Sequence, residues 1–303
     1  MGRSKSRSKR RIANRYVDMW AFLKMHPTNV DLLQRLKSAD DRQFGTHMDV
    51  CGSVYEPHAE KRGWEKNHIV GIRSDVWSPD AEELEKTLNA LKEGRRDQLR
   101  REIKRSGRLD AAQSEELRQE IGRDPLMSMK SSEIDGRRLV MKMFRTTGER
   151  IRWTGTVEEI TTREVHNSIG SRRAVLSLAM VLPGYEYLAT VQQNHRTFRI
   201  PSIFTFCLYD EDRERVWYVD INRKWVSIGA DFTVESGGRK IGDIDCKLIG
   251  FGYNAYVWVH EPSLAENRQF LDLLTLFTAT VGYHRAMRRS VRRRVRAALS
   301  GVS

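Results

Sequence analysis

Residues 263–283, SLAENRQFLDLLTLFTATVGY, constrain the fold of this chain more than any other stretch. Ser263 and Glu266 have the spacing of a capping box, in which each side chain satisfies a backbone N–H at a helix start. Behind them apolar residues occupy every face of a helix, so this helix must be enclosed by protein or by lipid. The apolar run Phe270–Val281 is shorter than the roughly 20 residues that cross a bilayer, and it includes Asp272. The sequence therefore predicts a helix buried inside its own domain.

The segment before this helix consists of short β-type runs separated by turn residues, beginning at Gly136. Ser236-Gly237-Gly238 is typical of a tight turn between two strands. An antiparallel barrel of about a dozen strands has a lumen too wide for its own side chains to fill, and a helix about 20 Å long would fill it. The sequence thus predicts an α+β fold, a closed antiparallel β-barrel of about 12 strands around a buried C-terminal hydrophobic helix. The runs are Leu139–Arg145, Arg150–Val157, Ile160–His166, Ala174–Leu182, Tyr185–Gln192, Arg196–Phe198, Ile203–Tyr209, Val216–Ile221, Trp225–Ile228, Phe232–Glu235, Lys240–Leu248 and Asn254–His260.

The N-terminal half has mainly helical spacing. Residues 12–25 and a run after Thr28 predict a short helical hairpin, and residues 43–77 fit no regular pattern. Ser78-Pro79-Asp80 is a strong helix start, and a second helix is expected from Asp110 to about Gly122. We therefore expect a disordered basic tail over residues 1–15, an α-helical region over 16–135, the barrel over 136–285 and a basic helical tail over 286–303.

The positive charge of the chain, +13 at pH 7, is concentrated at its ends. Residues 1–15 and 282–303 each contain seven basic residues and no acid, which leaves the part between them close to neutral. Such tails are typical of arms that bind a polyanion, although basic tails can also serve solubility alone. The candidate polyanion-binding residues are Lys9, Arg10, Arg11, Arg285, Arg288, Arg289, Arg292, Arg293, Arg294 and Arg296.

The C-terminal arginines leave a narrow apolar stripe between them at helical spacing. A helix of this kind can lie on a membrane, with the stripe in the interface and the arginines on headgroups. It can equally sit against an RNA backbone, or dock on the barrel through Met287 and Val291 with its arginines solvated. The stripe consists of Met287, Val291, Val295, Ala298 and Leu299.

The first residues match M-G-x-x-x-[ST], with Gly2 and Ser6 in the positions that N-myristoylation requires. One acyl chain beside a basic cluster is a two-signal arrangement that holds a protein on an anionic membrane. The motif is short, and Gly2 is a candidate lipidation site only in an organism that has the transferase.

The order of many strands followed by one buried helix resembles the tubby C-terminal-like superfamily, which includes phospholipid scramblases and LURP-one-related proteins. The similarity covers about residues 137–285 and is best from Phe204 onward, FTFCLYDEDRERVWYVDINRKWVSIGADFTVESGGRKIGDIDCKLIGFGYNAYVWV. The resemblance implies a closed barrel threaded by a hydrophobic helix, and binding of phosphoinositides or other anionic lipids rather than catalysis. Scramblases also carry a cysteine cluster and an acidic calcium-binding segment near this helix. The present chain has neither beside its helix, so lipid scrambling is not expected.

No common catalytic motif is present: GxSxG, the P-loop, GxGxxG and HExxH are all absent. Asp231, Asp243 and Asp245 could form a carboxylate site, although acids at turns and edge strands are far more common. The acidic run 210–214 lacks the Gly and closing Glu of an EF-hand loop, which favours a hairpin turn. Another candidate set, Cys51, His58 and His68, fits no zinc spacing. We therefore expect no enzyme, no cofactor and no metal.

Two functions from different classes remain open. In the first, the chain is a non-enzymatic protein that binds anionic phospholipid at a membrane surface and is held there by its basic tails. In the second, the tails bind RNA or another nucleic acid, and the barrel is a scaffold for a protein partner. The resemblance favours lipid. The three widely spaced cysteines fit a reducing compartment, and we expect a cytoplasmic protein that can be peripheral to a membrane.

Overall fold

Two compact units make up the chain in the computed structural model. The barrel unit lies within residues 1–72, 141–158 and 178–283, and the helical unit lies within residues 73–140, 159–177 and 284–303. The structure describes residues 13–20, 48–58, 60–78, 81–105, 111–124, 127, 137–147, 150–171, 173–194, 203–224, 230–249 and 252–300.

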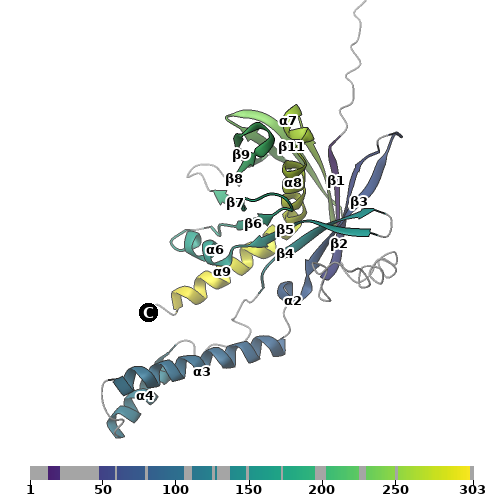
Figure 1. The fold of residues 1–303 in the computed structure, drawn as a ribbon. Helices are drawn as coiled ribbons and strands as arrows, with labels where there is room; N and C mark the ends of the chain where they lie inside the picture. The colour runs from purple at the N-terminus through teal and green to yellow at the C-terminus, as the bar shows by residue number, and fades with distance from the viewer. Residues whose placement is uncertain are drawn as a thin grey trace, which may run out of the picture. The chain divides into compact units, whose positions relative to one another are not determined.

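The barrel unit is a closed antiparallel barrel, as predicted (Figure 1). Each strand pairs with its neighbours in sequence, and β1 closes the ring by pairing with both β2 and β12. The N-terminal strand therefore seals the barrel. The strands are β1 (Arg15–Trp20), β2 (Met48–Pro57), β3 (Trp64–Arg73), β4 (Val140–Thr147), β5 (Arg150–Glu159), β6 (Ser177–Val181), β7 (Ala189–Asn194), β8 (Ile203–Asp210), β9 (Arg215–Arg223), β10 (Phe232–Ser236), β11 (Arg239–Ile249) and β12 (Gly252–Val259).

Helix α8 (Arg268–Thr280) runs inside this barrel (Figure 1). Every residue from Phe270 to Thr280 is buried. The ring of Phe277 lies 5.1 Å from that of Phe204 on β8 and 5.6 Å from that of Phe232 on β10. On another side, a Cβ atom on Gly155 of β5 would come within 2.8 Å of a methyl group of Leu276. Strands on several sides thus enclose the helix, which confirms the predicted arrangement.

The ends of α8 are capped differently from the prediction. A short helix α7 (Pro262–Glu266) precedes it, and the chain breaks at Asn267, whose side chain accepts the backbone N–H of Phe270 at 2.9 Å. The predicted capping box is therefore wrong, and Ser263 instead contacts Glu261. At the other end the Tyr253 hydroxyl donates to the carbonyl of Thr278 at 2.6 Å, which satisfies a group that every helix end leaves open.

The threonines of α8 let a partly polar helix lie in an apolar lumen. Thr275, Thr278 and Thr280 are buried, and their hydroxyls donate to backbone carbonyls three or four residues earlier at 2.6–2.7 Å. Since a buried hydroxyl without a partner is costly, these bonds within the helix make the threonines compatible with burial.

The predicted α-helical region over residues 16–135 is wrong in its first half. Residues 15–20 form β1, and most of the segment expected to be irregular forms β2 and β3 of the barrel. In RYVDMW, spacings of three and four residues suit a helix, but the burial alternates strictly along the strand. A six-residue run fits both periods, and pairing with β2 and β12 decides between them. The helix predicted after Thr28 lies outside the described residues.

The strand predictions between residues 139 and 260 need one further correction. Nine of the twelve runs coincide with β4–β12 in part or whole, but residues 160–166 fall mostly in a helix, α6 (Thr161–Ser168). This helix buries Glu164 and Ser168, one helical turn apart, so tertiary contacts override the β-branched residues that suggested a strand. Runs 196–198 and 225–228 lie outside the described residues. The turn at residues 236–238 is confirmed, with Gly237 and Gly238 both at positive φ between β10 and β11.

The helical unit contains the helices predicted after Ser78 and Asp110. The charged faces of α3 and α4 are largely exposed, while Leu88 and Leu99 of α3 are buried. The helices of this unit are α2 (Ser74–Trp77), α3 (Ala81–Arg105), α4 (Ala111–Arg123), α6 and α9 (His284–Ser300), and two short 3₁₀ turns in the barrel unit are η2 (Glu211–Arg213) and η3 (Val281–Tyr283).

Replacing Leu274 by Asp tests the enclosed helix. This side chain is fully buried, so an unpaired carboxylate there should cost several kcal/mol and abolish cooperative folding of the barrel. The change Leu188→Asp, at an exposed leucine of the same unit, is the matched control and should leave urea denaturation nearly unchanged. A soluble Leu274→Asp protein with a wild-type denaturation midpoint would contradict the enclosure.

Candidate polyanion-binding surface

Helix α9 has two unlike sides. At 3.6 residues per turn, six of its arginines fall within about 140° of the circumference, while Met287, Ser290 and Val291 on the other side are fully buried. The helix lies beside α6, in the same unit (Figure 1). The buried side therefore packs against protein and leaves the arginines outside. These six residues, called the arginine face below, are Arg285, Arg288, Arg289, Arg292, Arg293 and Arg296.

Most of the arginine face is open to solvent. Arg285, Arg289, Arg292 and Arg296 are exposed and make no ion pair with any acid in the described part of the chain. Arg293 is also exposed and Arg288 is half-buried, and both interact with other groups. A row of guanidinium groups held on one rigid helix is suited to bidentate contacts with phosphate oxygens.

Arg294 is the exception among the predicted polyanion-binding residues. Its side chain is only 11% exposed, and its Nη1 atom lies 2.9 Å from Glu164 Oε2 and 3.7 Å from Glu159 Oε1. Its Nη2 atom donates to the carbonyl of Arg137. The prediction for this residue is wrong, because its position on the buried side of α9 turns the guanidinium inward.

Two buried carboxyl groups share the single cation of Arg294. Glu164 also accepts the backbone N–H of Ser177 at 3.1 Å, and Glu159 accepts that of Leu139. Burial and, next, the charge of Glu159 raise the pKa of Glu164 to about 8, against the opposing effects of the Ser177 N–H and Arg294. At neutral pH the pair therefore retains a proton, which one guanidinium can balance.

Removing the Arg294 side chain should destabilise the fold far more than removing an arginine of the arginine face. Arg294→Met leaves buried carboxyl groups without their cation, a loss of about 3–5 kcal/mol. Arg292→Met, two residues away and exposed, should change the free energy of unfolding by less than about 0.5 kcal/mol. Guanidinium chloride denaturation measures both, and equal effects would contradict the inward position of Arg294.

The Glu164 carboxyl should make stability fall as pH rises. The folded chain keeps a proton on Glu164 that the unfolded chain releases above a pKa of 4.5, so this stabilisation is complete below that value and is lost as pH rises through about 8. Glu164→Gln should flatten the decline in the free energy of unfolding between pH 5 and 9, as measured by urea titration. The change Glu211→Gln in the exposed η2 turn is the control, and an unchanged slope in Glu164→Gln would refute the assignment.

The N-terminal candidates Gly2, Lys9, Arg10 and Arg11 lie outside the described residues, so they remain predictions.

The aspartates considered for catalysis have other partners in the structure. Asp243 lies 2.7 Å from Lys240, 2.9 Å from His260 and 3.1 Å from Lys224. Burial acts to raise the pKa of Asp243, but hydrogen bonds from these three neighbours outweigh it and lower the pKa. Asp231 accepts the backbone N–H of Cys246 at 3.0 Å. Both groups thus have structural partners on the barrel.

The proposed metal and calcium segments are likewise explained by local structure. The acidic run 210–214 forms the turn between β8 and β9, as predicted for a hairpin. Cys51 is buried and contacts the carbonyl of Val70, and the His58 ring accepts two backbone N–H groups. Among the described residues, no cluster of three or more His, Cys, Asp or Glu side chains has the arrangement of a metal site.

The structure also reveals a group of rings that sequence reasoning missed. Tyr16 faces Tyr55 on β2 and Tyr256 on β12, with ring centroids 5.4 and 4.8 Å apart. Trp64 lies within 6.0 Å of two of these rings, and Trp258 lies 5.6 Å from Tyr256. We call these five residues the aromatic surface. Strict alternation in RYVDMW and in YNAYVWV was the available signal, but only strand pairing brings the rings together.

Comparison of the chain with protein-family models, curated proteins and solved structures finds no match. The resemblance to tubby-like proteins therefore stays a prediction. Within the part of the chain that the structure describes, no helix combines the length and apolarity needed to cross a bilayer.

Proposed function

We propose that this protein is a non-enzymatic binding protein that attaches to anionic phospholipid at a membrane surface. The observation that carries the proposal is the arginine face of α9, which is presented to solvent by a helix whose other side is buried in protein. Since Met287 and Val291 are buried, the helix does not insert an apolar stripe, and its contact with lipid is electrostatic.

The expected strength of this contact is modest. Each basic residue near an anionic surface contributes about 1 kcal/mol, so the four exposed arginines without ion pairs contribute about 4 kcal/mol, an affinity near 1 mM. They span about 16 Å along the helix axis at 1.5 Å per residue, so a nearly flat headgroup layer can contact all of them together. Stable attachment requires a second signal, and the N-terminal basic residues of the same chain are candidates for it.

RNA is the second candidate, and the aromatic surface favours it. Rings on an outer sheet face are used by single-strand RNA-binding modules to stack bases. Lipid remains the first proposal because α9 itself contains no Phe, Tyr or Trp beside its arginines. The barrel with an enclosed helix is also the architecture that the resemblance to lipid-binding tubby-like proteins implied.

Charge reversal on the arginine face tests the proposal. The triple variant Arg289→Glu, Arg292→Glu, Arg296→Glu should lose co-sedimentation with phosphatidylserine-containing vesicles while its melting temperature stays close to wild type. Because exposed charges are screened by salt, raising the salt concentration from 50 to 200 mM should reproduce the loss in the wild type.

Three exposed arginines of α3 provide the matched control. Arg96→Glu, Arg100→Glu, Arg101→Glu makes the same change in net charge within the helical unit and should retain vesicle binding. Fluorescence anisotropy with a single-stranded RNA separates the two candidates. Binding of RNA but not vesicles, lost on reversal of the arginine face, would replace lipid by RNA, and equal loss in both triple variants would refute a specific surface.

A further inference from the structure

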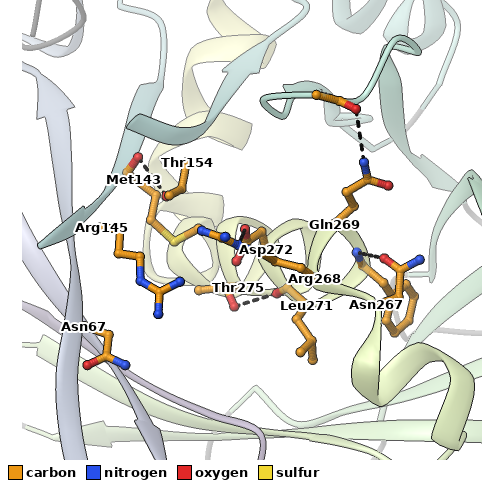
Figure 2. A network of polar contacts seen from close by, with 12 residues as sticks. Asn67, Met143, Arg145, Thr154, Asn267, Arg268, Gln269, Leu271, Asp272 and Thr275 are labelled. Carbon is orange, nitrogen blue, oxygen red and sulfur yellow. Dashed lines mark hydrogen bonds and ion pairs between the residues drawn. The ribbon is translucent and has the colours of Figure 1, made fainter. Parts of the chain in front are cut away.

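One end of the barrel interior contains a group of charged side chains from five elements. Figure 2 shows Arg145 and Asn67, on strands of the barrel wall, facing the first turns of α8, which carry Arg268 and Asp272. We call the group the inner charge cluster. Its members are Arg15 on β1, Glu56 on β2, His68 on β3, Arg145 on β4, and Arg268 and Asp272 on α8.

The ion pairs in this cluster are uneven. Arg15 Nη2 lies 2.9 Å from Glu56 Oε1 but 3.9 Å from Asp272 Oδ1. Arg268 Nε lies 3.6 Å from Asp272 Oδ2, and Arg145 Nη2 lies 3.9 Å from Glu56 Oε2. The last three distances are longer than hydrogen bonds. Arg145 and Arg268 therefore have guanidinium donors that their carboxylate partners do not use.

Several polar atoms of the cluster are buried without a hydrogen bond to the described chain. They are both ring nitrogens of His68, Nε of Arg15 and Oδ1 of Asp272, in residues that are 1%, 8% and 4% exposed. Buried polar atoms in native proteins are nearly always bonded to protein, water or a ligand. Three donors or acceptors from separate elements at one place indicate a common polar partner.

The charges of the cluster favour an anion. Three guanidinium groups face two carboxylates, and burial foremost lowers the pKa of His68 to about 4, which keeps its ring neutral. The net charge is thus about +1. The side chains of Arg145 and Arg268 are 38% and 52% exposed, so they connect the buried members to solvent.

We propose that the inner charge cluster is a binding site for a phosphate group that bears a proton, either inorganic phosphate or a phosphomonoester. The phosphate oxygens accept from the guanidinium forks of Arg145 and Arg268 and from Arg15 Nε. The P–OH group donates to Asp272 Oδ1, which would otherwise repel an anion. The proposal does not depend on lipid binding by α9.

The proton makes the site selective. Sulfate carries similar charge and size but has no O–H, so it leaves the Asp272 carboxylate without a donor and adds repulsion. Burial, the largest effect, raises the pKa of Asp272 to about 6 despite Arg15 and Arg268, while Glu56 raises it further and Arg145 lowers it. Below that pH the protonated Asp272 can itself donate, and sulfate should then bind as well.

Isothermal titration of the full-length protein in a phosphate-free buffer at pH 7.5 tests the site. We expect one equivalent of inorganic phosphate to bind, and sulfate to bind at least tenfold more weakly. Arg268→Gln and Arg145→Gln should each weaken phosphate binding at least tenfold. The control Arg239→Gln removes another partly exposed arginine of the barrel unit, paired with Glu261, and should change nothing.

The acceptor role of Asp272 has its own test. Asp272→Asn supplies an N–H donor in place of a carboxylate oxygen and should reverse the preference between phosphate and sulfate. If that variant does not fold, the wild type titrated with sulfate at pH 5 addresses the same question without a substitution, and tighter sulfate binding there than at pH 7.5 is expected. Weaker sulfate binding at pH 5 would refute the role of Asp272.

The source of the phosphate is decided by two further probes. Glycerol 3-phosphate, and vesicles containing phosphatidic acid rather than phosphatidylserine, carry the same phosphomonoester group. Binding of these probes, lost in Arg268→Gln, would indicate a lipid headgroup, whereas binding of inorganic phosphate alone would indicate the free ion.

Two outcomes would overturn the proposal. One is no heat with any of these probes, which would leave water as the partner of the buried atoms. The other is phosphate binding that Arg145→Gln and Arg268→Gln leave intact but reversal of the arginine face abolishes. The reversed variant is otherwise expected to bind soluble phosphate like wild type, so the two proposals can fail independently.

Discussion

The enclosure of α8 is the constraint on which the barrel depends. A ring of twelve strands leaves a lumen that its own side chains cannot fill, and an apolar helix cannot remain in water. Phe270, Phe277 and the leucines of α8 meet both needs, and each such side chain contributes roughly 1.5–3 kcal/mol on full burial. The glycine at position 155 shows how close the fit is, since a single Cβ atom there would collide with Leu276.

Closure of the ring has consequences for the charged residues. Strand β1 pairs with β12 and β2, so it brings Arg15 beside Glu56 and close to Asp272 of the enclosed helix. In the helical unit, packing of α9 likewise separates Arg294, which is bonded to buried carboxyl groups, from the arginines on the opposite side. In both units burial decides which arginine is structural and which is available to a ligand.

The sequence was sufficient for the features that depend on local pattern. The buried helix, the hairpin turn at Gly237 and Gly238, the helix after Ser78 and most strands after residue 139 were all predicted. It was not sufficient for β1 or for residues 160–166. Such short runs fit both helix and strand, and the choice between them is made by partners distant in the chain.

An all-round apolar segment of twelve residues must be enclosed wherever it occurs, so composition and length alone dictated the buried helix and the barrel large enough to hold it. The location of the positive charge at the two ends of the chain was equally plain from the residues. The tertiary structure alone decided that Arg294 points inward, that five rings meet on one sheet face, and that Arg15, His68 and Asp272 share one buried site. These are contacts between residues far apart in sequence, and no local preference encodes them.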